Sequence, residues 1–69
     1  MNRTIKVNGA DQAFAGAHVI DLLQMLGIDP ARRGVAVAIN GTVVPRARWT
    51  DARLDGGDDV EIVRPLSGG

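Results

Sequence analysis

Two Asn-Gly dipeptides constrain the fold of this chain more than any other feature. Asn8-Gly9 follows the alternating segment Thr4-Ile5-Lys6-Val7, and Asn40-Gly41 follows the apolar segment 35–39. Asn and Gly both tolerate the positive φ angles of a two-residue hairpin turn. We therefore predict two β-hairpins, with return strands at 10–14 and 42–44, and we expect 35–39 to be a central, well-buried strand.

A single amphipathic helix is predicted between the hairpins, over 18–26. Its apolar residues recur at spacings of three and four, at Val19, Leu22, Leu23 and Leu26. His18 stands at the N-cap position, Asp21 follows three residues later, and Gly27 is placed to end the helix. Met25 and the leucines are expected in the core.

The last part of the chain predicts one more strand. Residues 54–58 are rich in Asp and Gly and indicate a turn, and 59–64 then alternate in a strand pattern. The element order is ββαβββ, which is not the βαβ repeat of a parallel sheet. We predict an α+β fold of the β-grasp, or ubiquitin-like, type: a mixed sheet of four to five strands with one helix across it.

Composition narrows the functional classes. With 69 residues there is room for one domain, which we place at 1–66, followed by a flexible tail at 67–69. Eight basic and eight acidic residues balance, and the arginines are scattered among aspartates, so we expect a mixed solvated surface and no nucleic-acid partner. No stretch approaches the ~20 apolar residues of a membrane span, so we expect no membrane association and a cytoplasmic location.

Few side chains are arranged for chemistry. The chain has no Cys, and His18 has no second His to form a metal or nucleophile site. The acidic residues at 55–61 are expected to serve a turn and the surface, and Trp49 to seal one end of the core. We therefore predict no catalytic residue, no metal site and no bound cofactor.

The terminal Gly68-Gly69 is the remaining chemical feature. Without side chains, the two glycines can enter a narrow channel, and the carbonyl carbon of Gly69 is open to attack once its carboxylate is activated. Joining that carboxylate to AMP from ATP would activate it. This pattern indicates a protein whose own C-terminus is the substrate.

The second half of the chain carries a series of motifs in a fixed order. They are Val37-Ala38-Ile39-Asn40-Gly41, Val43-Val44-Pro45-Arg46, Trp49, Leu54, Gly57-Asp58, Val60-Glu61-Ile62-Val63 and Gly68-Gly69. Together they resemble the thiamine-biosynthesis sulfur carrier family, ThiS-type, over nearly the whole chain. The most specific part is the VVPRxxW segment that leads into GDxVEIV and the terminal Gly-Gly.

The resemblance implies a sulfur carrier that is not itself an enzyme. A ThiF-type adenylyltransferase would activate Gly69 with MgATP, and a persulfide donor would convert it to a thiocarboxylate. A ThiG-type thiazole synthase would then take the sulfur. Gly68 would give the tail access to both enzymes, and we expect partner docking at Val63, Arg64, Pro65 and Leu66, which precede the tail.

Two alternatives remain open at this stage. A carrier for another pathway, such as the small subunit of molybdopterin synthase, shares the fold and the terminal Gly-Gly. A non-covalent ubiquitin-like binding module would have the same body and an inert tail.

Overall fold

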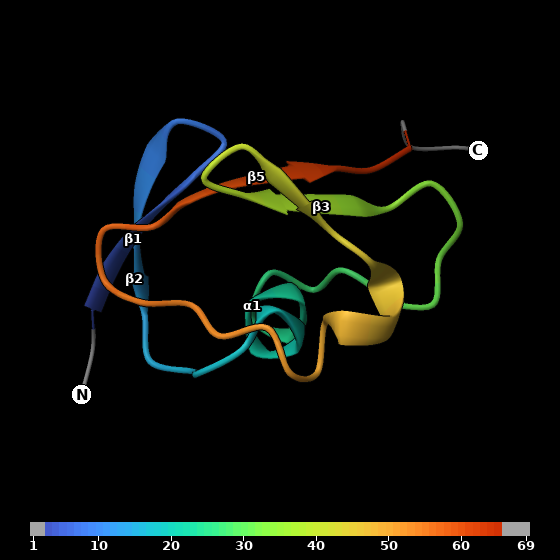
Figure 1. Cartoon of the computed structure of the whole chain (residues 1–69), viewed down its shortest axis with the longest axis horizontal. Helices are drawn as coiled ribbons and strands as arrows, with labels where there is room; N and C mark the ends of the chain where they lie inside the picture. Colours follow the sequence, from blue (N-terminus) through green and yellow to red (C-terminus); the bar gives the residue numbers. More distant parts are fainter. Residues whose placement is uncertain (1–2, 66–69) are drawn as a thin grey trace.

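One mixed sheet with a helix on one face forms the computed structural model, which describes residues 3–65 (Figure 1). The elements in chain order are β1 (Arg3–Val7), β2 (Ala10–Phe14), α1 (Val19–Met25), β3 (Ala36–Ile39), β4 (Thr42–Val44), the 3-10 helix η1 (Arg46–Arg48) and β5 (Asp59–Val63). The five-stranded sheet has the order β2-β1-β5-β3-β4. β1 and β5 are parallel, and the other neighbours are antiparallel. The predicted ββαβββ order and β-grasp fold are confirmed.

Both predicted hairpin turns are present. Asn8 and Asn40 each have a φ of 51°, and Gly9 and Gly41 have φ angles of 85° and 83°. Positive φ at both central residues is the conformation that a type I′ turn requires, and Asn and Gly adopt it at low cost. The two dipeptides therefore connect β1 to β2 and β3 to β4 as predicted.

The start of α1 is capped both by Asp21 and by a segment that is distant in the sequence. The carboxylate of Asp21 accepts a hydrogen bond from the N–H of His18 at 2.9 Å. The first two helical N–H groups donate to the carbonyl oxygens of Ala52 and Trp49, at 2.9 and 3.0 Å. Residues 49–54, which show no periodic pattern in the sequence, thus satisfy the helix end.

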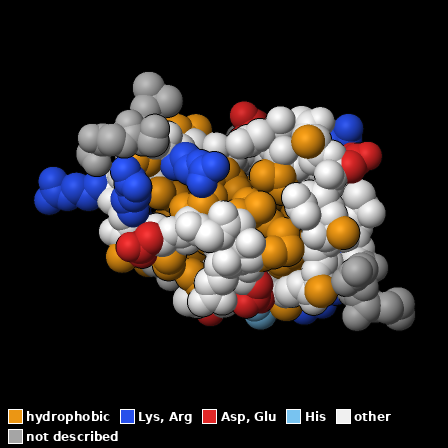
Figure 2. Space-filling model, turned by 180° about the vertical axis from the view of Figure 1, so that it is seen from behind, with side chains coloured by type: hydrophobic (Ala, Val, Ile, Leu, Met, Phe, Trp, Pro, Cys, Tyr) orange, Lys and Arg blue, Asp and Glu red, His pale blue; other side chains and the backbone are white. Residues whose placement is uncertain are grey.

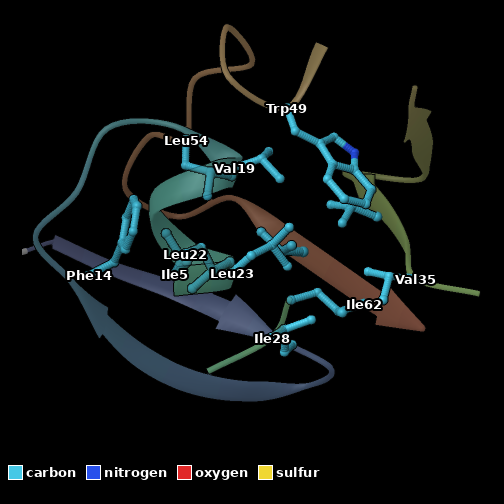
Figure 3. Close-up of a cluster of buried hydrophobic side chains, with 12 residues drawn as sticks. Ile5, Phe14, Val19, Leu22, Leu23, Ile28, Val35, Trp49, Leu54 and Ile62 are labelled. Atoms are coloured by element: carbon cyan, nitrogen blue, oxygen red, sulfur yellow. The ribbon is translucent and has the colours of Figure 1, made fainter. Parts of the chain in front are cut away.

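The core lies between α1 and the sheet (Figure 3). Its members are Ile5, Phe14, Val19, Leu22, Leu23, Ile28, Val35, Val37, Trp49, Leu54, Val60 and Ile62. Trp49 is only 3% exposed, which confirms its predicted structural role. Met25 is 45% exposed, so its predicted burial is wrong. It lies about 110° around the helix from the centre of the apolar stripe, at about 100° per residue.

The prediction of a central, well-buried strand at 35–39 also needs correction. β5 is the central strand, and β3 lies between β5 and β4. Val35 and Val37 are buried, whereas Ala36 between them is exposed. α1 covers one face of the sheet only, so alternate residues of β3 face solvent. The alternation of large and small residues in 35–39 reflects this one-sided burial.

Candidate functional site

The C-terminal end of β5 carries the residues predicted for partner docking. Val63 is 63% exposed, Arg64 is exposed, and Pro65 is partly buried. Leu66, Gly68 and Gly69 lie outside the described residues, as does the predicted domain boundary after residue 66. The described part of the site is therefore the strand end that precedes Gly68-Gly69.

β5 is hydrogen-bonded to a neighbour on each side. It pairs with β1 through Val7 and Val60, and with β3 as far as Ala36 and Val63. A central strand paired on both sides cannot shift without breaking two ladders. The sheet thus gives the C-terminal segment a fixed starting point.

Asn8 extends the pairing on the β1 side beyond the end of that strand. Its backbone N–H donates to the carbonyl oxygen of Val60 at 2.9 Å. Its side-chain Nδ2 donates to the carbonyl oxygen of Ile62 at 3.1 Å, and its Oδ1 accepts from the N–H of Ile62 at 2.8 Å. An amide side chain offers one donor side and one acceptor side, so it replaces a main-chain partner here. Sequence reasoning identified Asn8 only as a turn residue.

Gly34 and Pro65 are in close contact at the base of the C-terminal segment. Gly34 has a φ of +86°, and a Cβ atom built on it would lie 3.3 Å from Cδ of Pro65. Both the backbone angle and the short distance favour glycine at this position. The loop before β3 therefore packs directly against the residue that follows Arg64.

Arg46 forms hydrogen bonds with the loop at 30–35. Its Nη1 donates to the carbonyl oxygen of Pro30, and its Nη2 donates to those of Arg32 and Val35 at 2.9 and 3.3 Å. The guanidinium carbon lies 4.6 Å from the centre of the Trp49 ring. Arg can stack on an aromatic face while its N–H groups still donate in the plane. Arg46 thus links the buried Trp49 to the loop that supports Pro65.

Trp49 completes the connection to the sheet. Its indole Nε1 donates to the carbonyl oxygen of Val44 at 2.9 Å, so the one polar atom of this buried ring has a partner. The VVPRxxW segment therefore ties the end of β4 to the loop at 30–35. Its role in the described residues is to hold the base of the C-terminal segment in place.

Two surface areas adjoin the end of β5. On the sheet face opposite α1, Val63 lies beside Ala36 and the 70%-exposed Val43 lies beside Ala38. On the other side, a groove is lined by Val7, Asn8, Leu26, Ile28, Ile62 and Arg64. Exposed apolar side chains next to one another mark surfaces that can bind a partner.

Two carboxylates in the described residues, those of Asp58 and Asp21, accept hydrogen bonds that stabilise a turn and the start of α1. Residues 3–65 contain no group of three or more His, Cys, Asp or Glu side chains placed to hold a metal ion. The carboxylate of Asp58 accepts from the N–H of Asp55 at 2.8 Å and from Nδ2 of Asn40 at 3.1 Å. Hydrogen bonds from the N–H of Ala17 and then of His18 lower the pKa of Asp21.

Comparison with protein families gives a match over almost the entire sequence. The ThiS family model matches residues 5–69. The chain belongs to the ThiS family. The sulfur carrier protein ThiS of Escherichia coli is 37% identical to it over 60 residues, which cover 87% of this chain and 88% of that protein.

A second relative of this ThiS-family chain is much longer. A thiazole synthase of Paramagnetospirillum magneticum is 34% identical over 64 residues, which are 91% of this chain and 19% of that protein. The similarity therefore concerns a ThiS-like segment of that protein, about a fifth of its length.

Solved structures confirm the fold. The crystal structure of a thiamine biosynthesis protein (ThiS) from Geobacter metallireducens has a TM-score of 0.75 and 33% identity, with full coverage of both chains. A solution structure of a thiamine biosynthesis protein from the same organism has a TM-score of 0.74 and 32% identity, covering 100% of this chain and 88% of the other. Within residues 3–65, no helix is long and apolar enough to cross a membrane.

Proposed function

We propose that this protein is the sulfur carrier for thiazole formation in thiamine biosynthesis, and that the carboxylate of Gly69 carries the sulfur. The observation that carries the proposal is the ThiS family match, which extends through Gly68 and Gly69. The relationship to a thiazole synthase favours thiamine over molybdopterin as the destination of the sulfur. The carrier is acted on by enzymes and is not a catalyst itself.

The chemistry begins with activation of Gly69. A carboxylate oxygen attacks the α-phosphorus of MgATP on a ThiF-type adenylyltransferase, pyrophosphate leaves, and an acyl-adenylate forms. The terminal sulfur of a donor persulfide then attacks the acyl carbon and displaces AMP, which gives an acyl disulfide. A thiol attacks the donor's sulfur in that disulfide, so the thiocarboxylate leaves and the donor retains a new disulfide.

The second half of the cycle transfers the sulfur. A ThiG-type thiazole synthase takes sulfur from the thiocarboxylate, and the carrier returns to an ordinary carboxylate. The thiazole synthase relative supports this partner, because a ThiS-like segment forms part of that protein. ATP and persulfide donors are cytoplasmic, so we place the cycle in the cytoplasm.

The body of the protein positions the tail for both enzymes. β5 is paired on both sides, and Asn8 and Gly34 hold its C-terminal end. Gly68 has no side chain to obstruct a narrow channel. We place the docking contacts at Val63, Arg64, Pro65 and Leu66, since Val63 is largely exposed at the strand end nearest the tail.

Intact-mass measurement tests the proposal. The protein is incubated with its adenylyltransferase, MgATP, a persulfide donor and a thiol, and we expect a mass increase equal to exchange of one oxygen for one sulfur. Fragmentation should locate the sulfur at Gly69, and a variant that lacks Gly69 should keep its mass. Addition of thiazole synthase with its other substrates should restore the original mass. An unchanged mass, under conditions in which the same enzymes modify ThiS of Escherichia coli, contradicts the proposal.

A further inference from the structure

Arginines that are far apart in the sequence converge at the C-terminal end of β5. Arg33 precedes Gly34, which contacts Pro65, and Arg64 precedes Pro65. Nη2 of Arg46 lies 2.9 Å from the carbonyl oxygen of Arg32. We call Arg32, Arg33, Arg46 and Arg64 the basic end. Figure 2 shows Lys and Arg side chains grouped at one end of the face that it presents.

The other end of the same strand carries charges of both signs. Asp55 and Asp58 form the turn before β5, and Asp59 begins the strand. Near the basic end, the loop also contains Asp29, whose carboxylate accepts from the N–H of Ala31 at 2.9 Å. At the start of β5, Lys6 is the cross-strand partner of Asp59, and Arg53 forms an ion pair with Asp55, so carboxylates and cations are mixed there.

The basic end has little internal neutralisation among the described residues. The side-chain ion pairs within 4.0 Å in residues 3–65 are Lys6 with Asp11, His18 with Asp21, and Arg53 with Asp55. None of them includes an arginine of the basic end. Arg46 donates its N–H groups to carbonyl oxygens and keeps its charge, and Arg32, Arg33 and Arg64 are exposed, so a partner can meet the charge of the basic end.

We propose that the basic end docks against an acidic surface around the tail channel of the activating adenylyltransferase. The inference rests on the proposed function and adds the chemistry of the contact. Opposite charges at a contact raise the association rate and select orientation, and this effect weakens as salt screens it. The basic end directly precedes the tail in the sequence through Arg64, so an acidic surface beside the tail channel would meet it as the tail enters.

Charge reversal at Arg33 and Arg64, two exposed residues of the basic end, is the test. The variants are Arg33→Glu, Arg64→Glu and the double substitution. Arg53→Glu is the matched control, because it makes the same charge change as each single variant beside Asp55, in the turn before β5. Association with the adenylyltransferase is followed by stopped-flow without ATP, at a series of salt concentrations.

We expect the double variant to associate on the order of tenfold more slowly at low salt, and its rate to fall no further as salt is added. At moderate salt Arg53→Glu should keep the wild-type rate within about twofold, because an exposed charge more than about 10 Å from the contact is screened there. Arg33→Lys with Arg64→Lys should also keep the rate. Circular dichroism and thermal unfolding check that each variant is folded.

Two outcomes overturn the inference. Equal association rates and salt slopes for the double variant and Arg53→Glu remove any special role of the basic end. If the double variant associates at the wild-type rate without ATP and more slowly only when the measurement is repeated with MgATP, the arginines meet nucleotide phosphates and not an acidic protein surface. Association is measured apart from sulfur transfer, so failure of the mass test would concern the proposed function and leave this measurement interpretable.

Discussion

Asn8 and Asn40 bind β5 near its two ends, and they do so differently. Both have a φ of 51° and both precede a glycine with positive φ. Asn8 pairs its amide with the N–H and the carbonyl oxygen of Ile62. Asn40 accepts from the N–H of Asp59 at 2.9 Å, and its Nδ2 reaches the exposed carboxylate of Asp58.

The comparison extends to the neighbours of each asparagine. At the tail end, which we define as Asn8, Gly34, Ile62 and Pro65, the contacts are main-chain pairs and close packing. At the opposite end, the turn before β5 is held by exposed carboxylates and by the N–H of Gly57, which donates to the carbonyl oxygen of Thr4 at 2.9 Å. Main-chain hydrogen bonds hold both ends, so the difference lies in the side-chain bonds, which are partly buried at the tail end and exposed at the opposite end.

The largest expected effect comes from Gly16, which lies on the side of the opposite end. Nη1 of Arg3 donates to its carbonyl oxygen at 2.8 Å. A Cβ on Gly16 would lie 2.6 Å from Cβ of Asp21 and 2.9 Å from the ring of Phe14. We expect Gly16→Ala to lower the free energy of unfolding by about 1–3 kcal/mol, measured by urea denaturation. The folded variant should still gain sulfur at the wild-type rate, because the tail end is untouched.

Gly34→Ala is the matched substitution at the tail end. It places a side chain at a φ of +86° and 3.3 Å from Cδ of Pro65. We expect a loss of about 1–2 kcal/mol, the cost of a left-handed conformation for alanine. Displacement of Pro65 should also slow thiocarboxylate formation at temperatures where the variant is folded. If Gly16→Ala slows thiocarboxylate formation and Gly34→Ala does not, the tail end does not position the C-terminal segment for the reaction.

Replacement of each asparagine by glycine gives a smaller and more direct comparison. Glycine keeps the positive φ and removes only the side-chain hydrogen bonds. Asn8→Gly leaves the N–H and carbonyl of Ile62 without their partner, and because the site is only partly buried we expect a loss of about 1–2 kcal/mol. Asn40→Gly removes bonds in exposed surroundings and should cost about 0.5–1.5 kcal/mol.

Hydrogen exchange of the Ile62 amide separates the two variants further. Exchange should accelerate in Asn8→Gly by more than its global loss of stability explains, because the N–H loses its acceptor. In Asn40→Gly the same amide should follow global stability alone. Equal protection of Ile62 in both variants would show that Asn8 does not hold the end of β5.

Structure that depends on neighbouring residues could be predicted from the sequence, whereas contacts between distant residues could not. The hairpins and α1 follow from local features, namely the Asn-Gly angles and the apolar stripe that begins at Val19. The amide pairing of Asn8 joins residues 54 positions apart, and a dipeptide does not indicate which distant strand its side chain will meet. At Gly16 the constraint is the close approach of Asp21 and Phe14, which no local sequence pattern indicates.

In the candidate site, too, the sequence indicated the important segments but not their long-range contacts. The resemblance to the family identified the VVPRxxW segment, but the contacts of Arg46 with the loop at 30–35 depend on the folded arrangement. The convergence of Arg33 and Arg64 likewise depends on the contact between Gly34 and Pro65. The assignments of Gly68 and Gly69 remain predictions from the sequence and the family.

Acid provides the smallest perturbation of the two ends. The pKa of Asp21 lies below its usual 3.8, because its carboxylate accepts from the N–H of Ala17 and of His18 and lies near the His18 imidazole. The unfolded chain protonates this group first as the pH falls. The stabilising contribution is therefore complete above about pH 4 and is lost as the pH falls through the folded-state pKa. Asp21→Asn should remove this part of the pH dependence of the unfolding free energy.

Protonation of Asp21 should affect the start of α1 and leave the tail end unchanged. Asp21 touches the site of Gly16, whereas the pairing of Asn8 with Ile62 and the packing of Gly34 on Pro65 involve no titrating group. Below about pH 4, amides at the start of α1 should therefore exchange faster while that of Ile62 keeps its protection, apart from the intrinsic effect of pH. Asp21→Asn should show the faster exchange at neutral pH already. Loss of protection at Ile62 in step with α1 would mean that the two ends open as one unit.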